Sequence, residues 1–294
     1  LQQIPARDPI TGPMIRSLFL PEEGCRWGCF DYSQQEPRLV THYALKYGLR
    51  SVNEIADSYE QNSNADFHQL VADMTKIPRF QAKTINLGLF YGMGKAKLQA
   101  ELGVSKDRAT ELFNQYHTKV PFVKQLTNKI MNRAQDTGKI KTLLNRKCRF
   151  PKYEPILRGS DWGKFVPAED HERMIELQRM GEFLKDEEGI TIEDKDGNPR
   201  KNYWHKNSSR RAFTYKALNK VIQGSAADMT KKAMLDLYKE GILPHIQIHD
   251  ELDISIDGNE DKIKEIMENA VDLEIPNKVD CDAGPNWGST QEVK

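Results

Sequence analysis

Residues 244–257, PHIQIHDELDISID, decide the fold of this chain. Apolar residues alternate with other residues on both sides of the acidic centre His249-Asp250-Glu251. Strict alternation sends every second side chain toward one face, so the pattern predicts two strands of a hairpin with a rigidly held polar turn. The alternating residues are Ile246, Ile248, Leu252, Ile254 and Ile256. The hairpin therefore presents carboxylates at its turn.

A second short apolar run also ends in a carboxylate. Residues 28–33 read GCFDYS, with Asp31 followed at once by polar residues. Two carboxylates delivered at strand ends suggest a shared divalent metal, because hard cations take oxygen ligands. Taken singly, each aspartate has the plainer interpretation that it only terminates a strand. The rest of the chain decides between the two interpretations.

Length and composition predict a globular protein. The 294 residues, 38% of them hydrophobic, can bury a sizeable core in one large domain or two smaller ones. No run approaches the roughly 18 apolar residues of a membrane helix, and the N-terminus lacks a signal-peptide pattern, so we expect a cytoplasmic location. The 43 Lys and Arg residues balance 43 Asp and Glu residues. This balance neither supports nor excludes a polyanionic partner, which responds to local patches.

The cysteines and one basic run carry less specific signals. Cys25, Cys29, Cys148 and Cys281 form neither a CxxC pair nor a zinc-type spacing. We therefore predict four reduced thiols with structural roles. Residues 139–152 form the clearest basic run. We read it as a hairpin whose charges are either solvated or face a polyanion.

A helix is predicted over residues 79–92, RFQAKTINLGLFYG. Four of its residues recur every fourth position and so share one face about 18 Å long: Arg79, Lys83, Leu87 and Tyr91. The face changes from cationic to aromatic along its length. Such a face suits a ligand with a phosphate chain at one end and a flat ring at the other. The alternative is an amphipathic helix whose basic end is solvated.

The remaining pattern is mainly helical. Helices are predicted to begin near Gln35 and to cover residues 64–77, 105–118, 121–137, 168–185, 216–239 and 260–273. Residues 1–24 read as an extended lead-in, residues 278–282 as a final strand, and the polar residues 152–207 as an insertion. Asn219 and Gln223 lie one helical turn apart. Amides at this spacing either form structural hydrogen bonds or reach base edges in a minor groove.

Together these segments resemble the family A DNA polymerases, the class that contains bacterial DNA polymerase I and many phage replicases. Residues 31–38 (DYSQQEPR) are similar to the first catalytic motif of the family, residues 79–92 to the second and residues 249–251 to the third. Residues 1–5, 219–224 and 284–287 also match. The resemblance covers the whole chain except residues 152–207, and the size of that segment looks phage-like.

The resemblance implies an α+β fold. A polymerase palm, made of an antiparallel sheet with helices, would cover residues 1–45 and 215–294. A mainly helical fingers subdomain would be inserted at residues 46–214, with a phage-like insertion at about 152–207. The thumb and exonuclease domains of the family are expected to be absent from this chain.

The implied reaction is template-directed addition of dNTPs to a primer 3′-hydroxyl in phage or bacterial DNA replication or repair, which would take place in the bacterial cytoplasm. Asp31 and Asp250 would hold two Mg²⁺ ions, for which Mn²⁺ can substitute, and the Tyr32 carbonyl would supply a further oxygen. Glu251 would assist beside the metals. Lys83 would donate a proton to the leaving pyrophosphate.

The resemblance also implies two sets of binding residues. The incoming dNTP would contact Arg79, Lys83, Leu87, Tyr91, Glu36 and His68. Primer–template DNA would contact Arg38, Asn219, Gln223 and His249. Glu36 packed against Tyr91 would exclude a ribonucleotide 2′-hydroxyl. No membrane partner is implied, and the sequence does not identify replisome partners.

One departure and two alternatives accompany this interpretation. The family usually has an aromatic residue where Leu87 stands, which affects recognition of the sugar 3′ position. A single-subunit RNA polymerase would share the two-aspartate palm, although Glu36 and the glutamate after Asp250 favour DNA synthesis. The other alternative is a fragment that binds primer–template DNA without catalysis.

Overall fold

The structure is a computed structural model that describes residue 4 and residues 8–156, 164–177, 183–186, 188–201 and 209–293. Most of the family-like segment 1–5, and several parts of the predicted insertion at 152–207, lie outside the described residues. The chain divides into two compact units. Unit 1 comprises Leu1–Leu126, Thr142–Asn145 and Asn219–Lys294, and unit 2 comprises Thr127–Lys141 and Arg146–Leu218.

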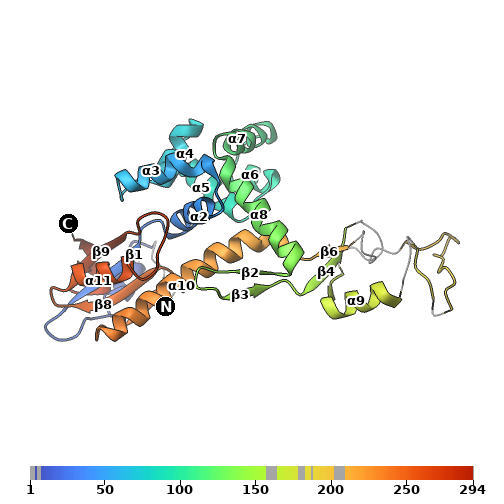
Figure 1. Ribbon diagram of the computed structural model, residues 1–294. Helices are drawn as coiled ribbons and strands as arrows, with labels where there is room; N and C mark the ends of the chain where they lie inside the picture. The colour runs from blue at the N-terminus through green and yellow to red at the C-terminus, as the bar shows by residue number, and fades with distance from the viewer. Residues whose placement is uncertain are drawn as a thin grey trace. The chain divides into compact units, whose positions relative to one another are not determined.

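Unit 1 is built on a five-stranded antiparallel sheet with the strand order β10-β9-β1-β8-β7 (Figure 1). The strands are β1 (Arg26–Tyr32), β7 (Ile246–Ile248), β8 (Glu251–Ile256), β9 (Val279–Gly284) and β10 (Gln291–Glu292). The central strand β1 pairs with β8 on one side and with β9 on the other. The predicted α+β class and the predicted final strand are confirmed, while β10 was not foreseen.

The predicted hairpin is β7 and β8. Ile248 pairs with Glu251, so the turn between the strands consists of His249 and Asp250. His249 adopts a left-handed backbone conformation with φ 56°. The apolar residues of the alternating pattern are buried, apart from the half-buried Ile248. Ile246 and Ile248 pair with Asp253 and Glu251 and share their face of the sheet, whereas Leu252, Ile254 and Ile256 point to the opposite face. Burial of apolar residues on both faces fixes the register of the strands and therefore the position of the acidic turn.

The two faces of the sheet differ in chemistry. Paired residues of antiparallel strands point to the same face, and alternate residues of one strand point to opposite faces. The register therefore gathers six residues on one face: Cys29, Asp31, Glu251, Asp253, Asp280 and Asp282. The other face is apolar and packs against α11 (Glu260–Glu268) (Figure 1). There the Tyr32 hydroxyl donates to the Met267 carbonyl over 2.7 Å. Acidic chemistry is thus confined to one side.

Unit 1 contains further helices besides α11. They are α1 (Thr11–Arg16), α2 (Gln35–Lys46), α3 (Asn53–Gln61), α4 (Phe67–Thr75), α5 (Arg79–Phe90), α6 (Lys95–Leu102), α7 (Lys106–Lys119) and most of α10 (Ala217–Lys239). Helix α8 (Pro121–Thr137) passes from unit 1 into unit 2. The predicted helices are confirmed with shifted ends. For example, α4 begins after Asp66, which caps the helix by accepting from the amides of His68 and Gln69.

The extended lead-in predicted for residues 1–24 is wrong in part, because α1 forms there. An Asp8 carboxylate oxygen accepts hydrogen bonds from the amides of Ile10 and Thr11, at 3.0 and 2.7 Å. These bonds stabilise the turn that leads into the helix. Proline is tolerated in a first helical turn, so the prolines of this segment do not prevent the helix. Two further helices, α3 and α6, were also missed; α6 buries only Leu98, which leaves almost no apolar pattern.

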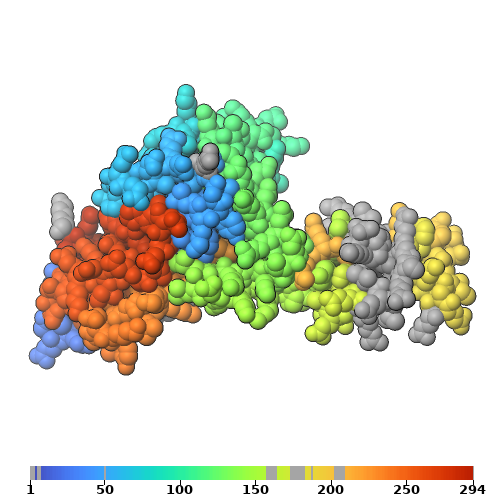
Figure 2. Space-filling view, in the orientation of Figure 1, coloured from blue at the N-terminus to red at the C-terminus, as the bar shows by residue number. Residues whose placement is uncertain are grey.

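Helix α2 is held against the segment that follows α11. The amide of Glu274 donates to Nδ1 of His42 over 3.0 Å. In Figure 2 the red surface of this segment borders the blue surface of α2. Burial, with a smaller effect from Lys46, lowers the pKa of His42 to about 4. The folded protein therefore keeps His42 neutral.

We expect this histidine to make stability fall in mild acid. The unfolded chain binds a proton below about pH 6.5 whereas folded His42 does so only near pH 4, so stability present above pH 6.5 is lost as pH falls between those values. Between pH 7 and pH 5 the loss is about 2 kcal/mol. His42→Asn keeps an acceptor for the Glu274 amide. Its free energy of unfolding should therefore fall by about 2 kcal/mol less than that of the parent chain between pH 7 and pH 5. Urea unfolding at both pH values measures this, with the exposed His245→Asn as the control, and equal losses in both variants would contradict it.

Unit 2 contains most of α8, two small sheets and helix α9 (Ala168–Leu177). The basic run forms the predicted hairpin from β2 (Lys139–Lys141) and β3 (Lys147–Arg149). A three-stranded sheet has the order β5-β4-β6, with β4 at Lys152–Pro155, β5 at Val166–Pro167 and β6 at Ser209–Arg211. Helix α9 ends at Leu177, and residues 178–182 of the predicted helix lie outside the described residues. The predicted end at Lys185 is wrong, because Phe183 and Lys185 form β-bridges with Lys201 and Thr191. No helix in the described part of the chain is long and apolar enough to cross a membrane.

Candidate active site

One cleft in unit 1 gathers most of the residues predicted to act in catalysis or binding. Helices α2, α4, α5 and α10, the end of β1 and the β7–β8 turn all contribute to it. The predicted residues that line it are Asp31, Tyr32, Glu36, His68, Arg79, Lys83, Leu87, Gln223, His249 and Asp250. Sequence reasoning had not assigned site roles to the other lining residues, which are Gln34, Gln35, Pro37, Ala226 and Ala227.

The acidic end of the cleft is formed by Asp31 and Asp250. The Tyr32 amide faces the Asp250 carbonyl at 3.4 Å, which ties the end of β1 to the hairpin turn. Burial raises the pKa of Asp31 to about 7, and the charges of nearby carboxylates add to this effect: Asp250, Glu251, Asp280 and Asp282. Burial also raises the pKa of Asp250. The protein thus holds carboxylates close together against their mutual repulsion.

This donor set fits a hard divalent cation. A bound cation relieves the repulsion that raises these pKa values, and Mg²⁺ takes oxygen ligands. The Tyr32 side chain points toward α11, so only its backbone can contribute an oxygen. Asp31 and Asp250 are outside the one compact three-residue group of possible metal ligands found among the described residues. The fit therefore rests on the chemistry of the carboxylates.

The cationic side of the cleft comes from α5. Arg79 and Lys83 both line the cleft, and Lys83 is exposed. Arg79 Nε is 2.6 Å from the Asp66 carboxylate, the same carboxylate that caps α4. Burial raises the pKa of Asp66, but the hydrogen bonds from Arg79 and the α4 amides outweigh it, so the pKa is lowered overall. Asp66 thus orients Arg79, a role that its capping position alone did not reveal.

His68 enters the cleft as a neutral side chain. It is buried, and the Asn86 amide lies 3.0 Å from its Nδ1. Burial lowers its pKa to about 4; the charge of Asp66 opposes this effect, while Lys83 and Arg79 add to it. An amide donating to Nδ1 leaves the ring proton on Nε2. His68 can therefore donate a hydrogen bond near neutral pH but brings no positive charge.

Glu36 and Tyr91 are in direct contact beside the acids. The Tyr91 hydroxyl donates a hydrogen bond to Glu36, which joins the end of α5 to the start of α2. Burial raises the pKa of Glu36, the Tyr91 bond lowers it, and the charge of Asp250 raises it further. Tyr91 lines a second groove with Thr84 and Leu87. Leu87 belongs to both hollows, so it separates the cleft from the groove.

A cleft that joins carboxylates to a cationic helix face is consistent with the family that the motifs suggested. The sequence model of the family described as DNA polymerase family A matches residues 1–289 of the chain. The chain belongs to DNA polymerase family A. The predicted family membership is thereby confirmed.

Relatives in this family come from phages and bacteria. The chain is 33% identical over 331 residues to a DNA-directed DNA polymerase of Pseudomonas phage M6, and the match covers 98% of the chain and 42% of the relative. It is 31% identical over 304 residues to DNA polymerase I of Caldicellulosiruptor bescii, covering 99% of the chain and 30% of that protein. The chain thus spans less than half the length of these family A relatives.

A solved structure shares the fold. It is the POL domain of Pol1 from M. smegmatis in complex with DNA primer-template and dNTP, at 25% identity and a TM-score of 0.68. The match covers 98% of this chain and 44% of that one. The predicted fold class of the family A chain is confirmed by this likeness.

Arg38 differs from its predicted role in DNA binding. The side chain is only 1% exposed. Its three guanidinium nitrogens donate to the carbonyls of Ser33, Pro276 and Ser63, at 2.8, 2.6 and 2.5 Å. The guanidinium also lies 4.4 Å from the ring centre of Tyr59. With its donors used inside unit 1, Arg38 joins three loops and has no exposed edge for a base, which corrects the prediction.

Two other predicted residues lie outside the cleft lining. Asn219 is half-buried on α10, and its side-chain oxygen is buried without a hydrogen-bond partner. Glu251 is half-buried on the acidic face of the sheet, with Oε1 buried and unpartnered. Burial and the charge of Asp253 raise the pKa of Glu251 to about 7. Gln223, by contrast, does line the cleft and faces Tyr91, whose pKa it lowers against a larger upward shift from burial.

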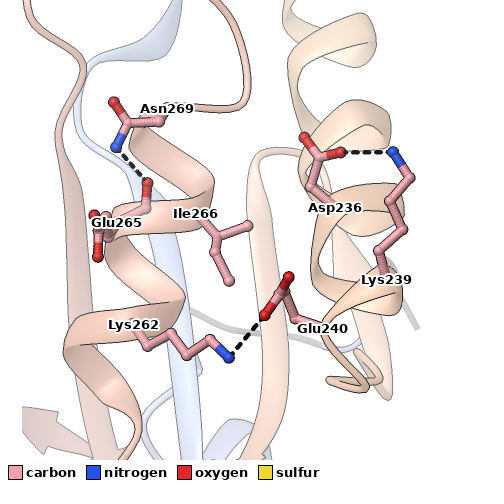
Figure 3. A pocket seen from close by; sticks show the side chains of 7 residues that line it. All are labelled: Asp236, Lys239, Glu240, Lys262, Glu265, Ile266 and Asn269. Atoms are coloured by element: carbon pink, nitrogen blue, oxygen red, sulfur yellow. Dashed lines mark hydrogen bonds and ion pairs between the residues drawn. The ribbon is translucent and has the colours of Figure 1, made fainter.

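Another hollow lies between α10 and α11, and none of the motif residues lines it (Figure 3). Opposite charges pair across it or on its walls: Lys262 with Glu240 at 2.9 Å and Lys239 with Asp236 at 3.3 Å. The Asn269 amide donates to a backbone carbonyl, that of Glu265. Four of the five charged side chains that line the hollow pair with one another, so it offers little unmatched charge for a ligand. It is therefore a surface groove and we assign it no function.

Proposed function

We propose that this chain carries out template-directed transfer of dNTPs to a primer 3′-hydroxyl. The observation that supports this proposal best is the cleft, which is lined by Asp31 and Asp250 and by the cationic side of α5. Nucleotidyl transfer needs both features, because a negative triphosphate must be held while charge develops on its leaving group. Relatives named as DNA polymerases support the choice of substrate. In this proposal the sheet and α10 form a palm, and residues 46–214 form fingers.

Asp31 and Asp250, with the Tyr32 carbonyl, would hold two Mg²⁺ ions, or Mn²⁺ ions in their place. Bound there, the ions would lower the pKa of the primer hydroxyl and neutralise charge on the leaving pyrophosphate. The carboxylates themselves fix the position of the primer end relative to the triphosphate. Their raised pKa values indicate that they gain stability when a cation arrives.

Three residues of α4 and α5 would bind the triphosphate. Arg79 is oriented by Asp66 through Nε, which leaves its two terminal nitrogens for phosphate oxygens. The exposed Lys83 lies one turn further along the same face and would donate a proton to the leaving pyrophosphate. His68 would donate a hydrogen bond from Nε2 as a neutral group. The charges at this end complement those at the acidic end.

The sugar and the DNA would be recognised elsewhere in the cleft. Glu36, held by Tyr91, would occupy the space that a ribonucleotide 2′-hydroxyl needs. Gln223 and His249 line the cleft near the acids and would contact the primer end or the minor groove. Asn219, one turn before Gln223 on α10, would contact the minor groove through its amide. Glu251 would assist beside the metal ligands.

Single-nucleotide extension of a labelled primer–template tests the proposal. With Mg²⁺ and one dNTP at a time, only the dNTP complementary to the template base should be added. Changing that base should change the dNTP that is used. Extension with NTPs in preference to dNTPs would support an RNA polymerase, and primer–template binding without extension would support a non-catalytic fragment. Either result would contradict the proposal.

Leu87 should affect recognition of the sugar 3′ position, because it lines the cleft one turn beyond Lys83. Leu87→Tyr introduces a hydroxyl that can replace the hydrogen bond lost when a nucleotide lacks its 3′-hydroxyl. One such bond is worth about 0.5–1.5 kcal/mol, so use of dideoxynucleotides relative to dNTPs should rise roughly 2- to 10-fold. Leu87→Phe has the ring without the hydroxyl and is the matched control. Equal ratios in the two variants would exclude the hydroxyl as the cause.

A further inference from the structure

A cluster of possible ligands lies on the acidic face of the sheet, where Glu251 of the third motif meets two residues outside the motifs. Cys29 comes from β1, and Glu251 and Asp253 come from β8. One ligand atom from each residue lies within 4.8 Å of those of the other two. The absence of a zinc-type spacing in the sequence had suggested structural roles for all cysteines. The register of β1 and β8, which pairs Cys29 with Asp253, creates the cluster instead.

Asp253 is the unusual member of the cluster. Its side chain is 0% exposed in the middle of a strand. Oδ1 accepts a hydrogen bond of 3.3 Å from the Trp27 indole, while Oδ2 is buried without a hydrogen-bond partner. Burying a carboxylate without full compensation is costly, so such groups are normally paired or bind metals. A cation bound to Oδ2 would supply the missing compensation.

The surroundings supply one positive charge and an apolar wall. The charge of Arg16 lowers the pKa of both Glu251 and Asp253, although burial raises them more. Arg16 itself lies 4.4 Å from the ring centre of Trp287, which packs with Trp27 in the core beside the cluster. Two carboxylates, a thiolate and a divalent cation carry a net charge of about −1, which Arg16 would balance. An occupied cluster is thus electrically neutral and screened from water.

The ligand types point to a thiophilic ion. Thiolate sulfur selects ions such as Zn²⁺ and Cd²⁺ over Mg²⁺, and Zn²⁺ combines sulfur with carboxylate oxygen. Ligands of a tetrahedral Zn²⁺ lie about 3.3–3.8 Å apart, given bond lengths of about 2.0–2.3 Å. Atoms already within 4.8 Å of one another reach that geometry by small side-chain rotations. A water molecule or the second oxygen of a carboxylate can complete the four ligands.

We propose that Cys29, Glu251 and Asp253 form a binding site for a thiophilic divalent cation of the Zn²⁺ class. Binding forms a metal–sulfur bond and releases the thiol proton to solvent. A cation bound in this site would hold the Glu251 carboxylate toward Asp253. If Glu251 assists catalysis, as the proposed function states, Zn²⁺ should inhibit extension by that route. The binding itself does not depend on the proposed function.

Cd²⁺ is the probe for the test, because its bond to thiolate gives a charge-transfer band in the near ultraviolet. The full chain is titrated with Cd²⁺ in excess Mg²⁺, which fills sites that have only oxygen ligands. The band should appear and saturate, and Cys29→Ala should abolish it. Cys281→Ala is the matched control, because Cys281 is also buried but lies on the opposite face of the sheet, so the band should remain unchanged. No band, or a band retained in Cys29→Ala, would overturn the proposal.

A second variant keeps the test informative should Cys29→Ala fold poorly. Asp253→Asn keeps the thiol and the shape of the side chain, so the band should persist. The affinity for Cd²⁺ should fall at least 10- to 100-fold, roughly the loss that is typical when a supporting residue of a metal site is removed. Unchanged affinity would contradict the assignment of Asp253. Asp31→Asn removes a proposed Mg²⁺ ligand and should retain the Cd²⁺ band at full affinity. Loss of the band in Asp31→Asn would place the ion at the catalytic acids and refute the separate site.

Discussion

Asp250→Asn should reduce nucleotide incorporation by at least about 1,000-fold while the protein stays folded. Asp250 lines the acidic end of the cleft at the hairpin turn, close enough for its charge to raise the pKa of Asp31. Losing several kcal/mol of charge stabilisation in the transition state corresponds to a factor of about 10³ or more. Single-turnover extension with saturating dNTP measures the effect without interference from DNA release.

The same substitution should not destabilise the metal-free protein. An amide has nearly the size of the carboxylate but removes one of the charges that oppose ionisation of Asp31. The melting temperature without metal should therefore equal or exceed that of the parent chain. The increase in melting temperature on adding Mg²⁺ should be smaller, because a ligand is lost. Retained incorporation, or an unchanged response to Mg²⁺, would refute the assignment of Asp250 as a metal ligand.

Asp280→Asn is the matched control for this experiment. Asp280 pairs with Asp31 across β1 and β9 and also raises its pKa. Its side chain is about half exposed, however, and lies 3.0 Å from Lys278. We expect its neutralisation to change incorporation less than tenfold, because an exposed ion pair contributes about 0–1 kcal/mol. A loss as large as that of Asp250→Asn would mean that total negative charge, and not ligand position, determines the rate.

The sequence predicted the parts of this site that local patterns determine. Alternation of apolar residues positions the turn at Asp250, and the spacing of four residues aligns Arg79 with Lys83 on α5. Both features depend only on the geometry of one element, because the side-chain period of a strand or helix fixes which residues share a face. A cleft assembled from the ends of such elements could therefore be outlined before the structure was known.

The wrong or missing assignments depend on contacts between distant segments. The resemblance assigned Arg38, the last residue of the first motif, to DNA binding, but the fold brings its partners Ser63 and Pro276 to it. The ion pair of Arg79 with Asp66 joins two helices across a break at Pro78. No spacing rule predicts such contacts from one sequence, because they arise from tertiary packing.

The Cys29 cluster shows the same limit in a sheet. Neither Cys29 nor Asp253 belongs to a motif, and they are 224 residues apart in the sequence. Predicting their contact needs the order of strands and the register of β1 with β8. A shift of one residue would send one of the two side chains to the opposite face. Chemistry that depends on register therefore becomes visible only in the structure.

Glu36→Ala should weaken discrimination against ribonucleotides roughly 5- to 150-fold. Glu36 is held in place by the Tyr91 hydroxyl at the start of α2, beside the cleft. If its side chain excludes a 2′-hydroxyl by volume, truncation removes a steric penalty of about 1–3 kcal/mol. The ratio of kcat/KM for dCTP and CTP on one primer–template measures this. The kcat/KM for dCTP itself should fall by a smaller factor than the dCTP/CTP ratio, because a deoxyribose does not need the vacated space.

Two further variants separate volume from charge and from hydrogen bonding. Glu36→Gln keeps the volume of the side chain and should keep most of the discrimination, although burial already raises the pKa of this carboxyl. Tyr91→Phe removes the hydroxyl that holds Glu36. Its loss of discrimination against CTP should lie between the losses of Glu36→Gln and Glu36→Ala. An unchanged dCTP/CTP ratio in Glu36→Ala would refute the steric explanation. A loss in Glu36→Gln as large as that in Glu36→Ala would instead assign the selectivity to the negative charge.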